Sequence, residues 1–251
     1  MKSKTTVSHP FGNPAPFAEP AWHNVLESPY YNDSHRKLRA FVRDYLEKHI
    51  VPVVEEWEET GEVPLEEIVR WARSGLAFQD MPEKYRPGIG LPAGIPEKEW
   101  DIFHFIILHQ ETARVGYVGC LGDRHTFRQP LFRHQVIRHK LAKMARYIES
   151  HWAWIEQIAY HIKATGGIGP ELSSRIALCK VQGGRLLELA NREAQQISGG
   201  NGYQRGGIGG RVEQISRDLR MSIVGGGSEE IITDLAVRQE MKHAKARGSK
   251  L

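Results

Sequence analysis

The sequence predicts an all-α protein made of two helical segments packed together. Apolar side chains recur every three or four residues over two long stretches, residues 130–163 and 170–197, which is the spacing of amphipathic helices. The alternation of apolar and polar residues that marks a half-buried strand does not occur between the helical stretches. Proline and glycine cluster between them, as expected for connections.

The composition narrows the possible functions. The 251 residues are 40% hydrophobic and 25% charged, with a formal net charge of +4, which is ordinary for a soluble domain. Lysine and arginine are interleaved with acidic residues, so we expect no nucleic-acid partner. Cys120 and Cys179 form no CxxC motif, which indicates a reducing compartment and no zinc site. The apolar runs are too short to span a bilayer, and no secretory signal is expected.

The first part of the chain is expected to be a proline-rich extended arm, residues 1–29, followed by a helical domain, residues 30–119. Its first helix should start at a cap on Asp33 or Ser34 and reach about Glu59, bent or interrupted at Pro52.

Two further helices are predicted in this domain, Pro64–Ser74 and Pro96–Arg114, separated by an irregular crossing over residues 79–96. Glu111 and Arg114 have the spacing of a helical ion pair, for which we expect a solvated contact.

Residues 124–244 are predicted to form a helical bundle, followed by a polar tail, residues 245–251. Gly183 and Gly184, inside a predicted helix, should allow close packing or a kink. The apolar stripe of the first long helix includes Val136 and Ile148. The predicted helices are Pro130–Lys163, Pro170–Ile197, Val212–Met221 and Ser228–Ala244.

The glycine-rich stretch Arg192–Arg217, with Gly225–Ser228 after it, is the most unusual part of the chain. Glycine costs about 1 kcal/mol against alanine inside a helix. Such a cluster is consistent with a flexible loop between helices. It is also consistent with a loop that presents backbone N–H groups to an anion or nucleotide.

Several motifs in order resemble the acyl-CoA dehydrogenase family over roughly residues 30–240. Residues 196–203 read Q-I-S-G-G-N-G-Y, Arg217 and Asp218 form an R-D pair, and residues 227–231 read G-S-E-E-I. Residues 124–131, R-H-T-F-R-Q-P-L, followed by Gln135, are similar to the family's R-x-x-F-G-x-P-L run. The H-x-x-L-R-x-F-V-R stretch from His35 and the M-P-E-K-Y turn at residues 81–85 match the family's first helical domain.

The resemblance implies two helical domains, the FAD-dependent dehydrogenation of an acyl-CoA and a homo-oligomer whose FAD contacts cross a subunit boundary. The family's central β domain is missing from this chain. Arg128 replaces the family's glycine, and the loop Gln204–Arg211 is longer than in the family. The residues implicated in FAD contacts are Arg124, Phe127, Gln135, Gln196, Gly199, Gly200, Ser228 and Glu230.

The family's catalytic glutamate has no evident counterpart here. One of its two usual places corresponds to Gly226, and the other lies on a helix that this chain lacks. A glycine cannot remove a proton. Glu229 and Glu230 are possible substitutes, but their position favours a role at the start of the last helix.

The twelve histidines do not predict a metal centre. His134, His139, His151 and His161 share no single helix stripe. The Glu240–His243 pair lacks the further ligands of a di-iron bundle, so we expect no metal. No Gly-x-Ser-x-Gly elbow and no P-loop occur.

The chain ends in Ser249-Lys250-Leu251, a tripeptide read by the peroxisomal import receptor, so we predict a peroxisomal protein. Two other functions stay open. The remaining bundle is also suited to a flavin-independent enzyme that binds a thioester or similar small molecule, or to a non-catalytic partner of a full-length relative. A shortened gene model would account for the missing domain as well.

Overall fold

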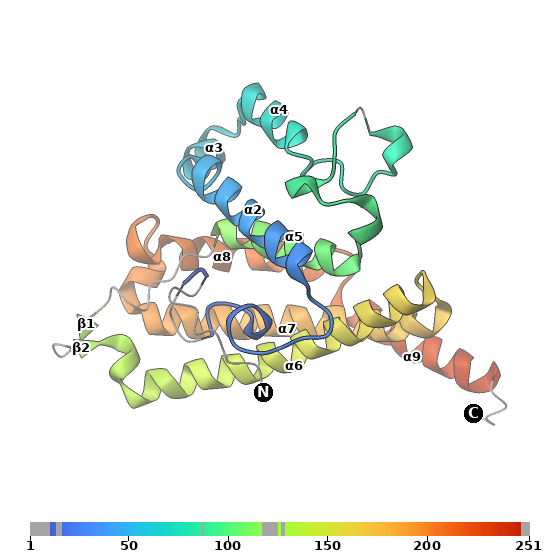
Figure 1. Cartoon of the computed structure of the whole chain (residues 1–251). Helices are drawn as coiled ribbons and strands as arrows, with labels where there is room; N and C mark the ends of the chain where they lie inside the picture. Colours follow the sequence, from blue (N-terminus) through green and yellow to red (C-terminus); the bar gives the residue numbers. More distant parts are fainter. Residues whose placement is uncertain (1–10, 14–16, 87, 117–124, 127–128, 247–251) are drawn as a thin grey trace, which may run out of the picture. The chain divides into compact units, whose positions relative to one another are not determined.

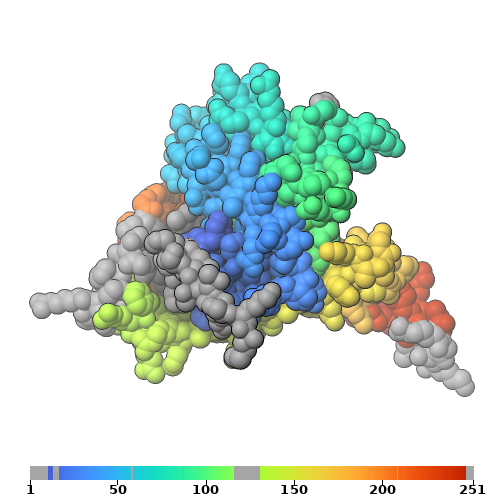
Figure 2. Space-filling model, in the orientation of Figure 1, coloured from blue at the N-terminus to red at the C-terminus, as the bar shows by residue number. Residues whose placement is uncertain are grey.

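The computed structural model describes residues 11–13, 17–86, 88–116, 125–126 and 129–246. It forms two compact units, residues 1–115 and 116–251. The described residues of the first run from blue to green and those of the second from yellow-green to red in Figure 1 and in the space-filling view of Figure 2. Most of the described residues are helical, which confirms the predicted all-α fold. The one strand ladder among them pairs β1 (His125–Thr126) with β2 (Gln129–Pro130). None of the described helices is long and apolar enough to cross a membrane.

In the first unit, α2 (Asp33–His49) packs against α5 (Ile102–Ala113), and this pair holds the core. Phe103 and Ile107 of α5 and Leu38 and Val42 of α2 have no exposed surface. The other elements are α1 (Ala21–Asn24), α3 (Val54–Thr60), α4 (Leu65–Arg73), η1 (Glu83–Tyr85), η2 (Pro92–Gly94), η3 (Glu97–Glu99) and η4 (Arg114–Gly116).

Side-chain caps set the helix starts in this unit. The α2 cap is Asn32, not Asp33 or Ser34, because the Asn32 side chain accepts hydrogen bonds from the backbone N–H groups of Ser34 and His35. Asp101 caps α5 in the same way, so that helix begins at Ile102 and not at Pro96. The predicted interruption at Pro52 is confirmed, since α2 ends at His49 and α3 begins at Val54.

Glu111 is buried at the centre of the first unit, so the predicted solvated contact with Arg114 is wrong. Glu111 and Arg39 are both 0% exposed, and Arg39 Nε lies 2.8 Å from Glu111 Oε1. Arg43 Nη2 donates to the same oxygen at 3.0 Å, whereas Arg114 Nε is 3.9 Å from Glu111 Oε2. The carboxylate therefore neutralises two α2 arginines across the α2–α5 interface.

Glu19 joins this cluster from the N-terminal segment. It accepts hydrogen bonds from Arg39 Nη2 at 2.7 Å and from Arg43 Nη1 at 3.1 Å. Burial opposes the charged form of Glu19, but hydrogen bonds from Arg43 and Asn13 and nearby arginine charges lower its pKa overall. Part of the predicted extended arm is thus docked on the first unit.

We expect Glu111→Gln to lower the free energy of unfolding by about 3–5 kcal/mol, because it leaves buried arginine charge without its counter-ion. Asp44→Asn is the matched control, since Asp44 and its partner Lys48 are 62% and 63% exposed. Such a surface pair contributes about 1 kcal/mol or less. Urea unfolding followed by circular dichroism measures both. Equal effects of the two substitutions would contradict the role assigned to Glu111.

In the second unit, α7 (Ser173–Ser198) is the central helix and packs against α6 (Gln135–Thr165), α8 (Gly207–Val224) and α9 (Glu229–Ala246) (Figure 1). The close packing predicted at Gly183 and Gly184 is confirmed. A Cβ atom on Gly183 would lie 3.3 Å from His151 Nε2 of α6, and one on Gly184 would lie 3.3 Å from Ile223 Cγ2 of α8. The short elements are η5 (Leu131–Arg133), η6 (Pro170–Leu172) and η7 (Gly199–Tyr203).

Most of the glycine-rich stretch Arg192–Arg217 is helical, contrary to the prediction of a loop, because α7 reaches Ser198 and η7 follows it directly. α8 begins at Gly207, earlier than the predicted start at Val212. Its first turn packs closely on η7, because a Cβ atom on Gly209 would lie 1.9 Å from the Asn201 carbonyl oxygen. The predicted long loop Gln204–Arg211 is therefore only a short connection between η7 and α8.

The second unit has fewer fully buried large apolar side chains than the first, among the described residues. The large apolar side chains with less than 2% exposure, among the described residues, all belong to the first unit. Val136 is 66% exposed and Ile148 is 49% exposed, so the single chain leaves these two residues of the predicted apolar stripe of α6 uncovered. Tyr203 of η7 and Met221 of α8 are exposed as well.

Candidate functional site

The predicted FAD-contact residues fall into two separate groups in the second unit. Arg124 and Phe127 lie outside the described residues. Gln135, Gln196, Gly199 and Gly200 form one group, which we call the α7-end group. Ser228 and Glu230 form the other, which we call the α9-start group.

An ion pair holds the α7-end group together. Gln196, Gly199 and Gly200 lie where α7 passes into η7, and Gln135 is the first residue of α6. Lys140 of α6 pairs with Glu193 of α7. The hydrogen bond from Lys140 lowers the pKa of Glu193. The start of α6 is therefore beside the end of α7.

The glycines of this turn differ in what they allow. Gly199 has φ 58 and ψ −137, a backbone conformation that is essentially restricted to glycine. A Cβ atom on Gly202 would meet Ser198 Cβ at 3.1 Å, so Gly202 serves the packing of the turn. Gly200 has no heavy atom within 4 Å of its Cβ position and is exposed. Gly200 is thus the glycine whose backbone a ligand can approach.

The α9-start group is fixed to the middle of α7. Arg185 Nη2 of α7 donates to Glu229 Oε1 at 2.7 Å, and Lys180 Nζ donates to the Gly227 carbonyl oxygen at 2.5 Å. From Arg185 to Gly199, an α-helix rises about 21 Å at 1.5 Å per residue. One chain therefore does not bring its two groups together around a single point.

The loop before α9 contains no side chain suited to remove a proton. Gly226 has φ +77 and no heavy atom within 4 Å of its Cβ position. Glu229 is paired with Arg185. Hydrogen bonds from its own backbone N–H and from the Ser228 hydroxyl lower the pKa of Glu230, which weakens it as a base.

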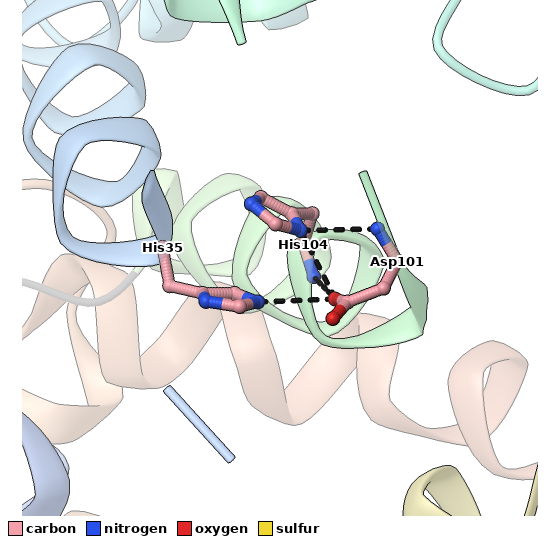
Figure 3. A group of neighbouring side chains, drawn as sticks. All are labelled: His35, Asp101 and His104. Atoms are coloured by element: carbon pink, nitrogen blue, oxygen red, sulfur yellow. Dashed lines mark hydrogen bonds and ion pairs between the residues drawn. The ribbon is translucent and has the colours of Figure 1, made fainter. Parts of the chain in front are cut away.

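A third group, His35, Asp101 and His104, lies in the first unit (Figure 3). His35 Nε2 and His104 Nδ1 are each 3.0 Å from Asp101 Oδ1. Sequence reasoning did not identify this group, although the Asn32-x-x-His35 and Asp101-x-x-His104 spacings match that of a capping box.

Helix capping explains this histidine group better than metal binding does. The Nδ1 atoms of His35 and His104 each accept a hydrogen bond of 3.1 Å from the backbone N–H of their own N-cap residue. The two rings are stacked, with centroids 3.8 Å apart and planes inclined by 25°. Ring nitrogens bind metals in the ring plane, so nearly parallel rings do not direct two lone pairs at one ion.

Cys179 is also a poor candidate for a catalytic nucleophile. Burial raises the pKa of its thiol to about 11, so it stays protonated near neutral pH and is a poor nucleophile.

Two family models match the chain. The model of the acyl-CoA dehydrogenase N-terminal domain matches residues 32–126, and that of the C-terminal domain matches residues 114–241. Because these ranges overlap, no residues remain between them for another domain.

Similar proteins carry the same family name. Acyl-CoA dehydrogenase AFT10-1 from Alternaria alternata is 24% identical over 424 positions, covering 94% of this chain and 98% of the relative. The alignment has 424 positions, whereas this chain has 251 residues. At least 173 aligned positions (424 − 251) therefore have no counterpart in this chain. No solved structure matches the chain.

Two further relatives match over shorter stretches. Acyl-CoA dehydrogenase apdG from Emericella nidulans is 34% identical over 134 residues, which is 53% of this chain. Probable acyl-CoA dehydrogenase YdiO from Escherichia coli K12 is 32% identical over 121 residues, which is 48% of this chain. The matched stretch spans only 30% of each of these relatives.

Proposed function

Because the chain belongs to the acyl-CoA dehydrogenase family, we propose that it is an FAD-dependent oxidoreductase acting on an acyl-CoA thioester or a related substrate. The observation that carries this proposal is the open backbone of Gly200 beside the exposed Gln196, in a turn with the family's sequence. FAD, when bound, would supply the acceptor for the hydride that leaves the substrate.

The α7-end group fits the nucleotide part of FAD. Gln196 and Gln135 are exposed side chains whose amides both donate and accept hydrogen bonds. Gly200 lacks the Cβ atom that would keep a flat ring away from its backbone. Arg124, outside the described residues, would neutralise a pyrophosphate.

A homo-oligomer is part of the proposal. The α7-end and α9-start groups are about 21 Å apart along α7, so each would complete a site together with residues of another copy. The exposed apolar side chains of the second unit also favour burial against a partner, because monomers rarely expose large apolar patches. Those at the α7 end and on α8 are Tyr203, at 88% exposure, and Met221, at 84%.

Removal of the substrate's α-proton is the reaction step for which this protein has the poorest candidate residue. The usual base position is Gly226, and the two neighbouring glutamates are engaged in an ion pair and in hydrogen bonds. We therefore propose low dehydrogenase activity for the chain alone.

This missing base favours a second candidate function, a non-catalytic partner of a full-length relative. Such a partner would contribute the α7-end group to a site whose base and central domain belong to the relative. Co-expression with a full-length family member and pull-down tests this alternative. Failure to form a complex would reject it.

We expect purified protein to retain visible flavin absorption after desalting and Gly200→Leu to lose it. The new side chain occupies open space, so folding should be unaffected. Gly167→Leu is the matched control, because Gly167 also has an open Cβ position.

The flavin-containing protein should sediment as a dimer or larger. A colourless parent protein that also fails to bind added FAD would reject the flavin proposal, and a flavin-loaded monomer would reject the shared site.

We expect Gly226→Glu to acquire or increase acyl-CoA dehydrogenation measured with an artificial electron acceptor. The left-handed backbone at φ +77 should cost about 1–2 kcal/mol of stability with any side chain. Gly226→Gln carries the same strain without a base, so its activity should stay at the low level of the parent. If flavin-loaded Gly226→Glu and Gly226→Gln are equally inactive, a missing base is not what limits this chain.

Peroxisomal import through Ser249-Lys250-Leu251 is the proposed localisation. A fluorescent protein fused in front of the full chain should collect in peroxisomes, and removal of Leu251 should leave it in the cytosol. Diffuse fluorescence of the complete fusion would contradict the proposal.

A further inference from the structure

A hollow in the first unit lies between α2, the end of α4 and the segment that includes η2. Its volume is about 510 Å³, and its lining includes Lys37 and Phe41 of α2, Arg73 of α4, and Gly90, Leu91 and Ala93. Small-molecule sites commonly have volumes of roughly 300–1,000 Å³. The hollow is distinct from the α7-end group and the α9-start group, which belong to the second unit.

The two cations of the hollow have no counter-ion within the described part of the chain. Neither Lys37 nor Arg73 forms an ion pair or a side-chain hydrogen bond there. In contrast, every other described arginine of the first unit has a carboxylate or carbonyl acceptor: Arg36, Arg39, Arg43, Arg70, Arg86 and Arg114.

Helix electrostatics account for only one of the two cations. Arg73 is in the last turn of α4, where a positive charge is favoured by the helix dipole. Lys37 is near the start of α2, where a positive charge gains nothing from the dipole. Both side chains are exposed, so water solvates them when the hollow is empty and an anion from solution can reach both.

The wall formed by residues 90–94 is rigid and strained. Leu91 is 5% exposed, which anchors this segment in the core. A Cβ atom on Gly75 would lie 2.5 Å from the Gly90 carbonyl oxygen, so the two backbones are in close contact. Ala93 has φ 57 and ψ 14, a left-handed conformation that is unfavourable for alanine. Strain of this kind is typical of binding sites.

We propose that this hollow binds a small organic phosphate. A phosphomonoester carries a charge of about −1.5 to −2 near neutral pH, which matches Lys37 and Arg73 together, whereas a carboxylate would neutralise only one of them. Phe41 and Leu91 provide apolar surface for the organic part of the ligand. The site does not depend on FAD or on the proposed dehydrogenase activity.

Titration of the full chain with phenyl phosphate, followed by ¹H–¹⁵N NMR, tests the proposal. We expect shift changes centred on Gly90, Leu91 and Gly94. Lys37→Gln and Arg73→Gln should each weaken binding about tenfold or more, as expected for loss of a charged hydrogen bond. Lys98→Gln is the control, because Lys98 also has no ion pair among the described residues but does not line the hollow.

Gly90→Leu provides an independent test. A Cβ atom on Gly90 meets no heavy atom within 4 Å, and its φ is outside the left-handed region, so the leucine should fill the hollow without disturbing the fold. Binding should then be lost while the circular dichroism spectrum is unchanged. The proposal is overturned if benzoate binds as tightly as phenyl phosphate, if Arg73→Gln binds normally, or if the shift changes are scattered over both units.

Discussion

A single helix, α7, holds the second unit together and fixes the spacing of the α7-end group and the α9-start group. Lys180 and Arg185 attach the loop before α9 to the middle of this helix, and Glu193 attaches the start of α6 near its end. An uninterrupted helix is stiff, so the separation of the two groups cannot close within one chain. Any site that needs both groups at one point must use two copies.

The overlap of the two family models has a physical consequence for the helical units. The matches to the family's N-terminal and C-terminal domain models overlap, so each helical unit must bury its apolar faces without further residues between the two matches. The first unit has a closed core and the buried Arg39–Glu111 pair. The described residues of the second unit form no equivalent core, and side chains such as Val136 and Tyr203 are exposed.

Local signals in the sequence were sufficient for most of the fold. The interruption at Pro52 and the helix end at Gly166 follow from backbone chemistry within a few residues. The choice of Asn32 over Asp33 as a cap depends on where the chain enters the helix, which sequence does not specify. The burial of Glu111 depends on arginines about seventy positions earlier in the chain, a pairing that no local pattern reveals.

For the candidate site, too, the sequence predicted local features but not the distances between segments. The motif residues Gln196 and Gly200 lie exposed at one turn, where the glycines determine the local backbone, and their contact with FAD stays a prediction. It did not predict that Ser228 and Glu230 lie well away along α7, since that distance follows from tertiary packing. Likewise, the stacked pair His35 and His104 arises only because two capped helix starts meet in space.

The loop around Gly226 is held in place by hydrogen bonds from α7. Lys180 donates hydrogen bonds to the carbonyl oxygens of Ile223 and Gly227, on both sides of the turn. The left-handed residues Gly226 and Gly227 then need no side chain of their own to hold the turn. A Cβ atom on Gly227 would clash with Ile232 Cδ1 at 2.7 Å, whereas Gly226 faces open space. The turn therefore depends on α7 and not on a catalytic carboxylate, so Gly226 is the position in this turn where a base fits without repacking the loop.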